Sequence, residues 1–340
     1  MKSIRIWFDG MDGQFDVHSN FISSILKERY NIILDERTPE YVFYTFKSRN
    51  YLKYNCVRIF YTAENVVPDF NLCDYAIGFS RLEFSDRYFR YPIYLVDRFV
   101  AYSGDDYARD LVRAQHKHED VSEIFKNKTD FCSFVYTNGD AAKCREKIFW
   151  ALSSYKRVNS GGGYLNNIGG PVEDKLSFQK RHKFVIAFEN TSSPGYTTEK
   201  IVHAYSAGAI PIYWGNPEIY REFNPESFID CYAMGLREDG EDQAIKKIVE
   251  KVKTLDQNDD LYRAMMSTPA FTRENNIELQ NNKLREFLFH IFDQENAFRR
   301  NRFYIGERYE RKQRIGNEFY FQCRKLIPIR DAGKRMLGIK

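Results

Sequence analysis

Short apolar runs alternate with polar connectors through the first third of the chain. Five of these runs have the length and the β-branched or aromatic content of strands: IRIWF (4–8), YNIIL (30–34), YVFYTF (41–46), VRIFYTAEN (57–65) and DYAIGFS (74–80). Between the first two, SNFISSILKERY (19–30) spaces its apolar residues as a helix does. Strands interleaved with helices predict an α/β fold with a mainly parallel sheet.

A second α/β pattern follows and is the clearest in the chain. The buried-strand run KFVIAFEN (183–190) precedes the helical pattern TTEKIVHAYSAGA (197–209), and IPIYWG (210–215) is the next strand. This order makes one βαβ unit, in which ligands gather at the carboxyl ends of the strands. A further amphipathic helix is predicted over DQAIKKIVEKVKTL (242–255).

The glycine-rich stretch VNSGGGYLNNIGGP (158–171) separates the two patterns. It lacks the spacing of a dinucleotide-binding fingerprint, so we interpret it as an interdomain connector, with a phosphate-binding loop as the alternative. At 340 residues two domains are expected. We therefore predict domains at 1–157 and 158–298, followed by a tail at 299–340.

Charge is distributed unevenly along the chain. The net charge is +4, yet residues 299–340 hold 13 Lys/Arg against 4 Asp/Glu, so the tail carries +9 and the rest −5. No apolar stretch is long enough to span a bilayer, and the start lacks the apolar core of a secretory signal. The six cysteines have no C-x-x-C spacing. These features together favour a cytoplasmic protein with reduced, structural thiols.

Lys200 is the unusual residue of the second pattern. Thr197 or Thr198 is the expected N-cap and Gly208 the stop, which puts a lysine in the first helical turn. A cation there opposes the helix dipole by roughly 0.3–1 kcal/mol. If an anion binds at the start of the helix, the electrostatic interaction of Lys200 there becomes favourable. Glu199 could then accept hydrogen bonds from a ribose. The alternative is a solvated Glu–Lys pair on a surface helix.

The segment FENTSSPGYTTEKIVHAYSAGAIPIYWGNP (188–217) resembles the signature of the bacterial α-1,3-fucosyltransferases, glycosyltransferase family 10. The resemblance continues in 58–92 and 144–163. It implies a GT-B fold, in which two Rossmann-like domains face each other across a cleft. It also implies inverting transfer of fucose from GDP-fucose, held by the C-terminal domain, to the 3-hydroxyl of GlcNAc in N-acetyllactosamine-type glycans, giving Lewis x-like products.

The resemblance also implies roles for single residues on the donor side. Lys200 matches the lysine that contacts the diphosphate, and Glu199 the neighbouring donor-binding carboxylate. Asn190 and Tyr196 match residues that line the same pocket. Arg145, in KCREKIF, aligns with an arginine on the diphosphate, where a bidentate guanidinium suits the charge of the leaving group. Without the resemblance, a solvated helix charge is the favoured interpretation of Arg145.

On the acceptor side, Glu64 in YTAEN aligns with the proposed general base of the family. An inverting transfer needs one carboxylate near the acceptor hydroxyl, and Glu64 follows a strand-like run. On spacing alone, a loop or helix-cap glutamate is the favoured interpretation of Glu64. Ala63 stands where close bacterial relatives have glycine. Trp7 and Asp9 are candidates for acceptor contact on weaker grounds.

The sequence favours no obligatory metal. The carboxylate clusters GDD (104–106) and NDD (258–260) lie in polar contexts rather than after a buried strand, and His182, His203 and His290 have no ligand spacing. Lys200, Arg145 and a helix N-terminus can supply positive charge instead. Stimulation of the activity by Mn²⁺ or Mg²⁺ is compatible with this expectation.

The basic, aromatic tail allows two interpretations. It resembles bacterial family members whose tails are thought to dock on the inner membrane, which would make 299–340 a peripheral contact with anionic lipid on the inner face. A plain solubilising tail is the alternative, and no nucleic-acid-binding motif accompanies the charge. For the whole chain, three other functions stay open. They are a GT-B transferase using another nucleotide-sugar, an enzyme that also makes the α-1,4 linkage, and a non-catalytic glycan-binding protein.

Overall fold

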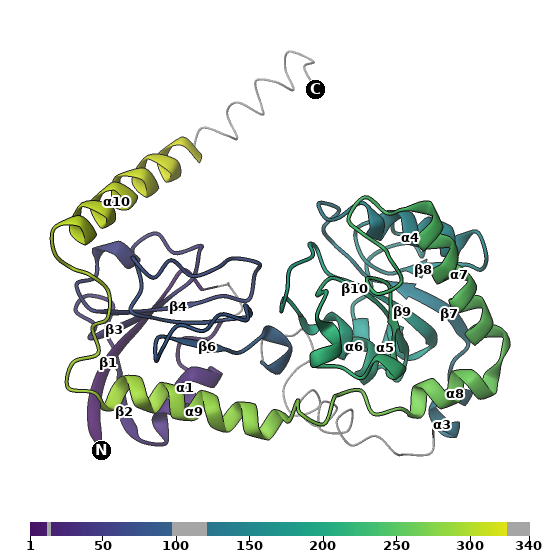
Figure 1. The fold of residues 1–340 in the computed structure, drawn as a ribbon, viewed down its shortest axis with the longest axis horizontal. Helices are drawn as coiled ribbons and strands as arrows, with labels where there is room; N and C mark the ends of the chain where they lie inside the picture. Colours follow the sequence, from purple (N-terminus) through teal and green to yellow (C-terminus); the bar gives the residue numbers. More distant parts are fainter. Residues whose placement is uncertain (12–14, 97–120, 325–340) are drawn as a thin grey trace, which may run out of the picture. The chain divides into compact units, whose positions relative to one another are not determined.

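The computed structural model of the chain describes residues 1–11, 15–96 and 121–324. They form two compact units (Figure 1). The first unit comprises residues 1–78, 82–89 and the chain from 285 onward, and the second comprises 79–81 and 90–284. Each unit has its own sheet, so the predicted α/β fold with two parallel-sheet domains is confirmed.

The sheet of the first unit has the strand order β2-β1-β3-β4-β5-β6. Its strands are β1 (Lys2–Asp9), β2 (Tyr30–Leu34), β3 (Tyr41–Tyr44), β4 (Val57–Tyr61), β5 (Tyr75–Gly78) and β6 (Tyr88–Arg90). The pairings of β1 with β2 and β3, of β3 with β4 and of β4 with β5 are all parallel. The carboxyl ends of β1, β3, β4 and β5 therefore meet at one edge, as the strand-like runs of the sequence predict.

Most of the helical cover of this sheet comes from the far end of the chain. After α1 (Phe21–Lys27), capped by Asn20, the described connections hold only short 3₁₀ turns, η1 (Tyr51–Lys53) among them. The cover comes from α9 (Ile277–Asp293), whose Phe292 ring lies 4.2 Å from that of Tyr41, while α10 (Ile305–Arg324) packs Tyr309 against a buried cluster of the same unit. The expectation of helices interleaved with these strands is therefore met only once.

The second sheet is parallel throughout, in the order β11-β10-β9-β7-β8. Its strands are β7 (Asp130–Phe134), β8 (Val158–Ser160), β9 (His182–Phe188), β10 (Ile210–Trp214) and β11 (Ile229–Asp230). The helices of this unit are α3 (Ser122–Lys126), α4 (Cys144–Ser153), α5 (Lys175–Lys180), α6 (Glu199–Ser206), α7 (Asp242–Gln257) and α8 (Asp259–Ser267), with short turns η2 (Ile93–Leu95), η3 (Ile219–Arg221) and η4 (Pro225–Ser227).

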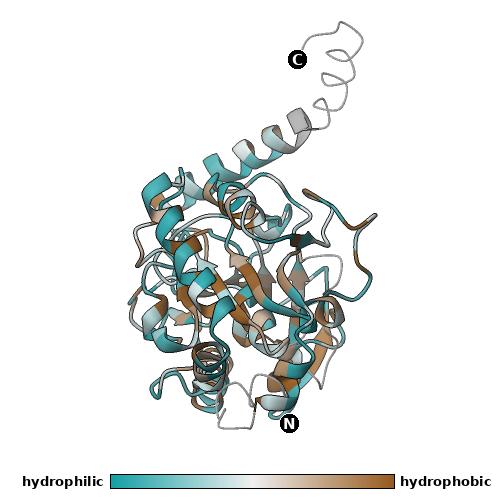
Figure 2. Ribbon diagram, turned by 90° about the vertical axis from the view of Figure 1, so that its right-hand side faces the viewer, coloured by the Kyte–Doolittle hydropathy of each residue, from teal (hydrophilic) through white to brown (hydrophobic). Residues whose placement is uncertain are grey.

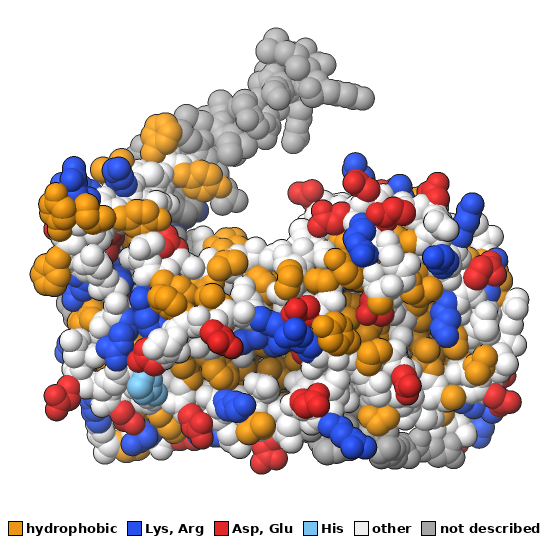
Figure 3. All heavy atoms as spheres, viewed as in Figure 1, with side chains coloured by type: hydrophobic (Ala, Val, Ile, Leu, Met, Phe, Trp, Pro, Cys, Tyr) orange, Lys and Arg blue, Asp and Glu red, His pale blue; other side chains and the backbone are white. Residues whose placement is uncertain are grey.

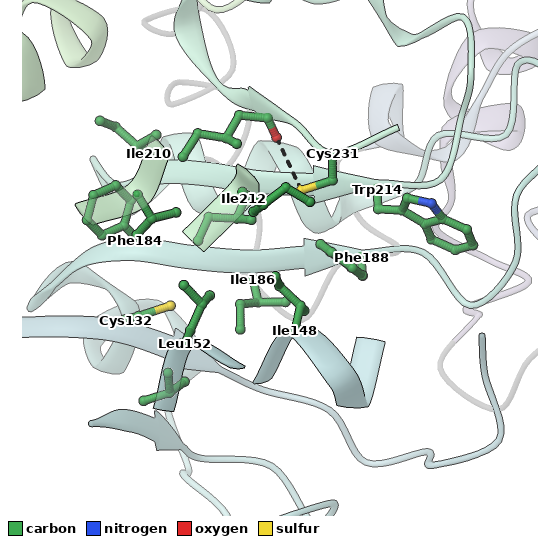
Figure 4. Packing of buried hydrophobic residues seen from close by; sticks show 14 of the residues in the cluster. Cys132, Ile148, Leu152, Phe184, Ile186, Phe188, Ile210, Ile212, Trp214 and Cys231 are labelled. Carbon is green, nitrogen blue, oxygen red and sulfur yellow. Dashed lines mark hydrogen bonds between the residues drawn. The ribbon is translucent and has the colours of Figure 1, made fainter. Parts of the chain in front are cut away.

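The core of the second unit explains why its strands are apolar at nearly every position. Ile186 of β9 lies close to Ile148 of α4, and Ile212 of β10, which pairs with Ile186 in the sheet, belongs to the same buried cluster (Figure 4). Helices on both faces bury both sides of a parallel strand, so strict alternation is lost. The apolar residues accordingly concentrate on the strands and the polar ones on the outer helix faces (Figure 2).

The predicted boundary between residues 157 and 158 is wrong. β7 and β8 pair with each other, and β7 pairs with β9, so 130–157 belongs to the second sheet. The glycine-rich stretch is part of that unit rather than a connector, because a Cβ on Gly162 would lie 2.0 Å from the carbonyl of Tyr136. The boundary predicted after 298 also differs, since residues from Arg285 onward belong to the first unit.

The predicted βαβ unit is confirmed. β9, α6 and β10 follow one another, and β9 pairs in parallel with β10. Thr198 is the N-cap residue of α6, one of the two predicted candidates. Gly208 ends the helix with φ +61°, a left-handed conformation that glycine adopts without strain. This unit positions the site described next.

Candidate active site

A buried carboxylate marks the place where β9 gives way to the loop before α6. Glu189 follows the last residue of β9 and has no exposed surface. Its two carboxylate oxygens accept hydrogen bonds from the backbone N–H and from the hydroxyl of Thr198, both at 2.7 Å. Glu189 thereby ties the carboxyl end of β9 to the start of α6.

Lys200 is held at the same place by two carboxylates. Its Nζ lies 3.1 Å from Oε2 of Glu189 and 3.8 Å from Oε1 of Glu199, and its side chain is 18% exposed. Burial favours the neutral amine, but the carboxylates of Glu189 and Glu199 outweigh it and raise the pKa of Lys200 above its usual value. Lys200 is therefore a fixed, largely buried cation, and the solvated surface pair considered from the sequence is wrong.

The Gly-Asn pair after β10 fixes the loop that carries these residues. Gly215 has φ +155°, and a Cβ there would lie 2.4 Å from Cγ of Glu189, so only glycine leaves room for the buried carboxylate. The side chain of Asn216 accepts a hydrogen bond from the N–H of Gly195 at 2.8 Å and donates one to the hydroxyl of Thr197 at 3.0 Å. The WGN segment thus holds the loop against the carboxyl ends of the strands.

Arg145 reaches the same edge from α4. It is 1% exposed, and its Nη1 donates to the side-chain oxygen of Asn190 at 3.0 Å while Nη2 donates to the carbonyl of Asn138. The guanidinium carbon lies 4.3 Å from the centre of the Tyr136 ring, a cation–π contact. Arg145 is therefore a fixed, buried group, and the solvated helix charge considered as its alternative is wrong.

Beside Arg145 and Lys200 lies one cavity of about 190 Å³ in the second unit. Four of the predicted donor-side residues line it together: Arg145, Asn190, Glu199 and Lys200. Sites for drug-sized ligands measure roughly 300–1,000 Å³, so the cavity has room for one part of a nucleotide-sugar. Fixed cations and the amino end of α6 make it suited to a diphosphate.

Two residues of this site have no role assigned from the sequence. Lys175 of α5 lines the cavity as a third cation, and its Nζ donates to Nδ1 of His203 at 3.0 Å. Burial lowers the pKa of Lys175 to about 8. Glu189 is the other, although it stands inside the recognised FEN motif, which was the available signal. Lys175 has no such signal, because its burial depends on the packing of α5 against α6.

Tyr196 lies in the loop but is not among the residues that line the cavity. It is buried, its N–H donates to the carbonyl of Ser193 at 3.1 Å, and its ring meets that of Phe79 edge to face with centres 5.0 Å apart. In the structure it supports the loop, and its predicted donor contact stays a prediction.

Glu64 belongs to the first unit and follows the carboxyl end of β4. Its side chain is exposed, and its backbone N–H and carbonyl both bond to the hydroxyl of Thr62, at 3.1 and 3.0 Å. At the carboxyl end of β1, which β3 separates from β4, Asp9 accepts a hydrogen bond from the N–H of Asn50 at 3.0 Å, which gives this carboxylate a structural role. Trp7 is partly buried within β1.

Among the residues that the structure describes, no three His, Cys, Asp or Glu side chains come together as metal ligands. Asp259 and Asp260 of the NDD cluster lie in the first turn of α8, and the GDD cluster lies outside the described residues. The three histidines face different partners: His182 bonds to Phe178, His203 to Lys175 and His290 to Asp86. Five cysteines are buried and unpaired.

A larger cavity, of about 670 Å³, lies in the first unit at the amino ends of β1, β3 and β4. That edge is opposite to the one that carries Glu64, and none of the predicted site residues lines it. Size alone therefore does not identify the site. The fixed charged side chains that line the smaller cavity identify it as the candidate site.

Comparison with known proteins agrees with the fold and the donor-side motif. Residues 6–97 match the model of the α-(1,3)-fucosyltransferase FucT N-terminal domain, and residues 125–285 match that of the glycosyltransferase family 10 (fucosyltransferase) C-terminal domain. The α-(1,3)-fucosyltransferase FucT of Helicobacter pylori is 38% identical over 236 residues, which are 61% of this chain and 49% of that protein. The chain thus spans about half the length of this curated relative.

Solved structures show the same relationship. A crystal structure of an α1,3-fucosyltransferase with GDP-fucose superposes with a TM-score of 0.67 at 27% identity, covering 88% of this chain and 94% of that one. The Anabaena protein HepE, solved with UDP and glucose, superposes with a TM-score of 0.50 at 9% identity, covering 84% and 100%, which shows the fold alone.

Two Rossmann-like units, with a cation-lined cavity at the start of a helix in the second, define a protein with the GT-B fold of glycosyltransferases. The chain belongs to glycosyltransferase family 10, the fucosyltransferases, because the two family models together match 253 of its 340 residues, 92 from the first and 161 from the second.

Proposed function

We propose that this chain is an inverting α-1,3-fucosyltransferase that moves fucose from GDP-fucose to the 3-hydroxyl of GlcNAc in N-acetyllactosamine-type glycans. The observation that carries the proposal is the cavity in which Arg145, Lys175 and Lys200 converge at the amino end of α6. The 38% identity with the Helicobacter pylori enzyme over 61% of this chain supports the choice of donor and linkage.

In this proposal the second unit binds the donor. Arg145 and Lys200 contact the diphosphate, with Lys175 as a third cation, and the free N–H groups of α6 point to the same anion. Negative charge grows on the leaving oxygens as the fucose–oxygen bond breaks. Buried cations fixed before the reaction stabilise that charge more than mobile surface groups, because they need no reorganisation.

The first unit supplies the general base. Glu64 removes the proton of the acceptor hydroxyl as that oxygen attacks the anomeric carbon from the face opposite GDP, which inverts the configuration. Its exposure after a parallel strand supports this role, because a base must reach an acceptor that enters from solvent. The hydrogen bonds of Thr62 to its backbone fix the turn from which Glu64 projects.

The proposal needs no obligatory metal, since three cations line the proposed diphosphate cavity. Divalent ions in other transferases neutralise the same leaving group, so the cations of Arg145, Lys175 and Lys200 would take that part here. Activity that survives exhaustive chelation would support this part of the proposal, and complete loss restored by Mn²⁺ would contradict it.

We propose a cytoplasmic protein that contacts the inner face of the membrane peripherally through residues from 299 onward. Exposed Phe303, Tyr304 and Ile305 stand at the start of α10 and Phe319 near its end. Orange and blue spheres mingle at the start of α10 in Figure 3, viewed as in Figure 1. No helix in the described ranges combines the length and apolarity that crossing a bilayer requires. Flotation with vesicles tests the contact.

One transfer experiment tests the main proposal. The full chain is incubated with GDP-fucose and either N-acetyllactosamine or its β-1,3-linked isomer, and the linkage of the product is assigned by NMR. We expect α-1,3-fucosylated N-acetyllactosamine. An α-1,4 product from the isomer would broaden the specificity, transfer from a UDP-sugar alone would reassign the donor, and glycan binding without transfer or donor hydrolysis would indicate a non-catalytic protein.

A further inference from the structure

A second charged cavity lies entirely within the first unit. It measures about 290 Å³ and is enclosed by the segment around η1 and by the first half of α10. Six of its lining residues are cations: Lys53, Arg58, Arg300, Arg302, Arg311 and Arg314. The same lining holds two carboxylates, so the surrounding charge is 6 − 2 = +4.

The floor of this cavity is buried and nearly balanced in charge. Arg58 is 1% exposed, and its Nη2 lies 2.8 Å from Oε1 of Glu310. Arg300 is also buried and pairs with Asp74 and with Glu310. Nη1 of Arg58 is buried and has no hydrogen-bond partner. That atom is itself closed to solvent, so what the floor offers a ligand is the positive charge of two guanidinium groups held in fixed positions.

The rim, in contrast, carries excess positive charge. It comprises Lys53, Arg302, Arg311 and Arg314, and its carboxylate is Glu307, 3.7 Å from Arg311. Other contacts of the rim cations are to neutral groups: Lys53 bonds to Asn50, and Arg302 bonds to Asn55 and lies over the ring of Phe298. Four cations and one carboxylate leave +3 around the mouth. Cations gathered without counter-charge repel one another, and a bound anion removes that repulsion.

We propose that this cavity binds a compact phosphate-bearing anion, in the class of pyrophosphate or a phosphate monoester or diester. Arginine guanidinium groups in a fixed arrangement suit phosphate oxygens, since each can donate two parallel hydrogen bonds. The cavity is distinct from the donor site, because its lining residues belong to the first unit and those of the donor site to the second. The proposal does not rest on the transferase activity.

The test removes rim charge and compares it with equal charge removed elsewhere on the same helix. R311Q/R314Q deletes two lining cations, whereas R308Q/K312Q deletes two exposed cations of α10 that do not line the cavity. Pyrophosphate is titrated calorimetrically into the full-length protein, with and without saturating GDP to account for binding at the donor site. We expect about a tenfold or greater loss of affinity in R311Q/R314Q and less than about twofold in R308Q/K312Q.

Two results would overturn the proposal. Equal losses in both double variants would mean a diffuse attraction by the helix rather than a cavity. The absence of a GDP-independent pyrophosphate site in the unaltered protein, together with equal vesicle binding by both double variants, would mean that the cavity takes no phosphate. Circular dichroism of each variant checks that the fold is intact, and the buried Arg58 and Arg300 are left unchanged for that reason.

A vesicle arm distinguishes the two sources of such a group. The proteins are sedimented with phosphatidylcholine vesicles containing 0 or about 30% phosphatidylglycerol, with and without pyrophosphate. Binding that needs phosphatidylglycerol, falls in R311Q/R314Q but not in R308Q/K312Q, and is displaced by pyrophosphate identifies a lipid headgroup. Pyrophosphate binding without such displacement identifies a free phosphate compound.

Discussion

The ammonium of Lys200 lies 3.1 Å from the carboxylate of Glu189, which is completely buried where β9 ends. A cation in the first turn of a helix opposes the helix dipole, and here a carboxylate that directly follows the preceding strand offsets that cost. The pair also keeps Lys200 in place when no donor is bound. Glu189 is thus a positioning residue, whereas Lys200 faces the cavity.

Glu189→Gln should lower the free energy of unfolding of the protein. The amide can still accept from Thr198, but Lys200 loses its nearest counter-charge, and we expect the free energy of unfolding to fall by about 1–3 kcal/mol. Urea denaturation measures this change. Glu199→Gln is the control: its partner lies 3.8 Å away and it is partly exposed, so about 1 kcal/mol or less is expected. Equal losses in both would refute the positioning role.

Gly215→Ala tests the steric part of the same arrangement. The new methyl group would lie 2.4 Å from Cγ of Glu189, and we expect a loss of stability of about 2–4 kcal/mol from overpacking together with backbone strain. Gly170→Ala is a matched control, because its φ of +153° is nearly the same and nothing lies within 4 Å of the added Cβ. Similar melting temperatures for the two variants would show that the contact with Glu189 contributes nothing.

The sequence predicted the β9–α6–β10 unit because its signals are local. An apolar run, a threonine N-cap and Gly208 follow one another within about thirty residues, and each acts through its own neighbours in the chain. Asn190, Glu199 and Lys200 belong to this same unit, so the sequence could also predict that they lie together. Arg145 joined them through the family resemblance, since nothing between α4 and β9 indicates their contact.

What the sequence missed depends on contacts between distant segments. The sequence of α9 is typical of an amphipathic helix, but nothing in it indicates which sheet the helix covers. Phe292 contacts Tyr41, which lies more than 240 residues earlier in the chain. The predicted boundary between residues 157 and 158 was wrong for the same reason. β7 pairs with β9, and the sequence of neither strand indicates its partner. Lys175 became part of the site only through the packing of its helix on α6.

Lys200→Ala should weaken donor binding. Removing one buried cation from the proposed diphosphate site is expected to reduce GDP affinity by about 10- to 100-fold, the size of one or two charge-assisted hydrogen bonds. Isothermal calorimetry with GDP measures it. Lys180→Ala, which removes an exposed lysine of α5 outside the cavity, should bind GDP as the unaltered protein does. Unchanged GDP affinity in Lys200→Ala would count against the site.

Glu64→Gln should abolish turnover and leave donor binding intact. The amide keeps the shape of the side chain but cannot accept the acceptor proton, so we expect kcat to fall by about 100-fold or more. Its GDP affinity should be unchanged, because the donor cavity belongs to the second unit. Glu36→Gln removes another exposed carboxylate of the first unit and should retain full activity. Wild-type turnover by Glu64→Gln would refute its role as base.

Donor affinity should fall as the pH rises through about 8, because burial lowers the pKa of Lys175 to about 8. The protonated ammonium attracts the diphosphate, so its contribution is complete well below that pKa and is lost above it. A single lost proton allows a decrease of up to about tenfold per pH unit. GDP phosphates are ionised above pH 7, and a titration kept between pH 7 and about 8.5 stays below the pH at which guanine loses its N1 proton, so the change belongs to the protein.

Calorimetric titrations with GDP over that range measure the profile. Lys175→Met keeps the length of the side chain without the charge, and its affinity should be lower at pH 7 and nearly independent of pH. Lys200 should not contribute, because Glu189 and Glu199 raise its pKa above the range tested. A pH-dependent limb that persists in Lys175→Met would assign the titration to another group and remove Lys175 from the donor site.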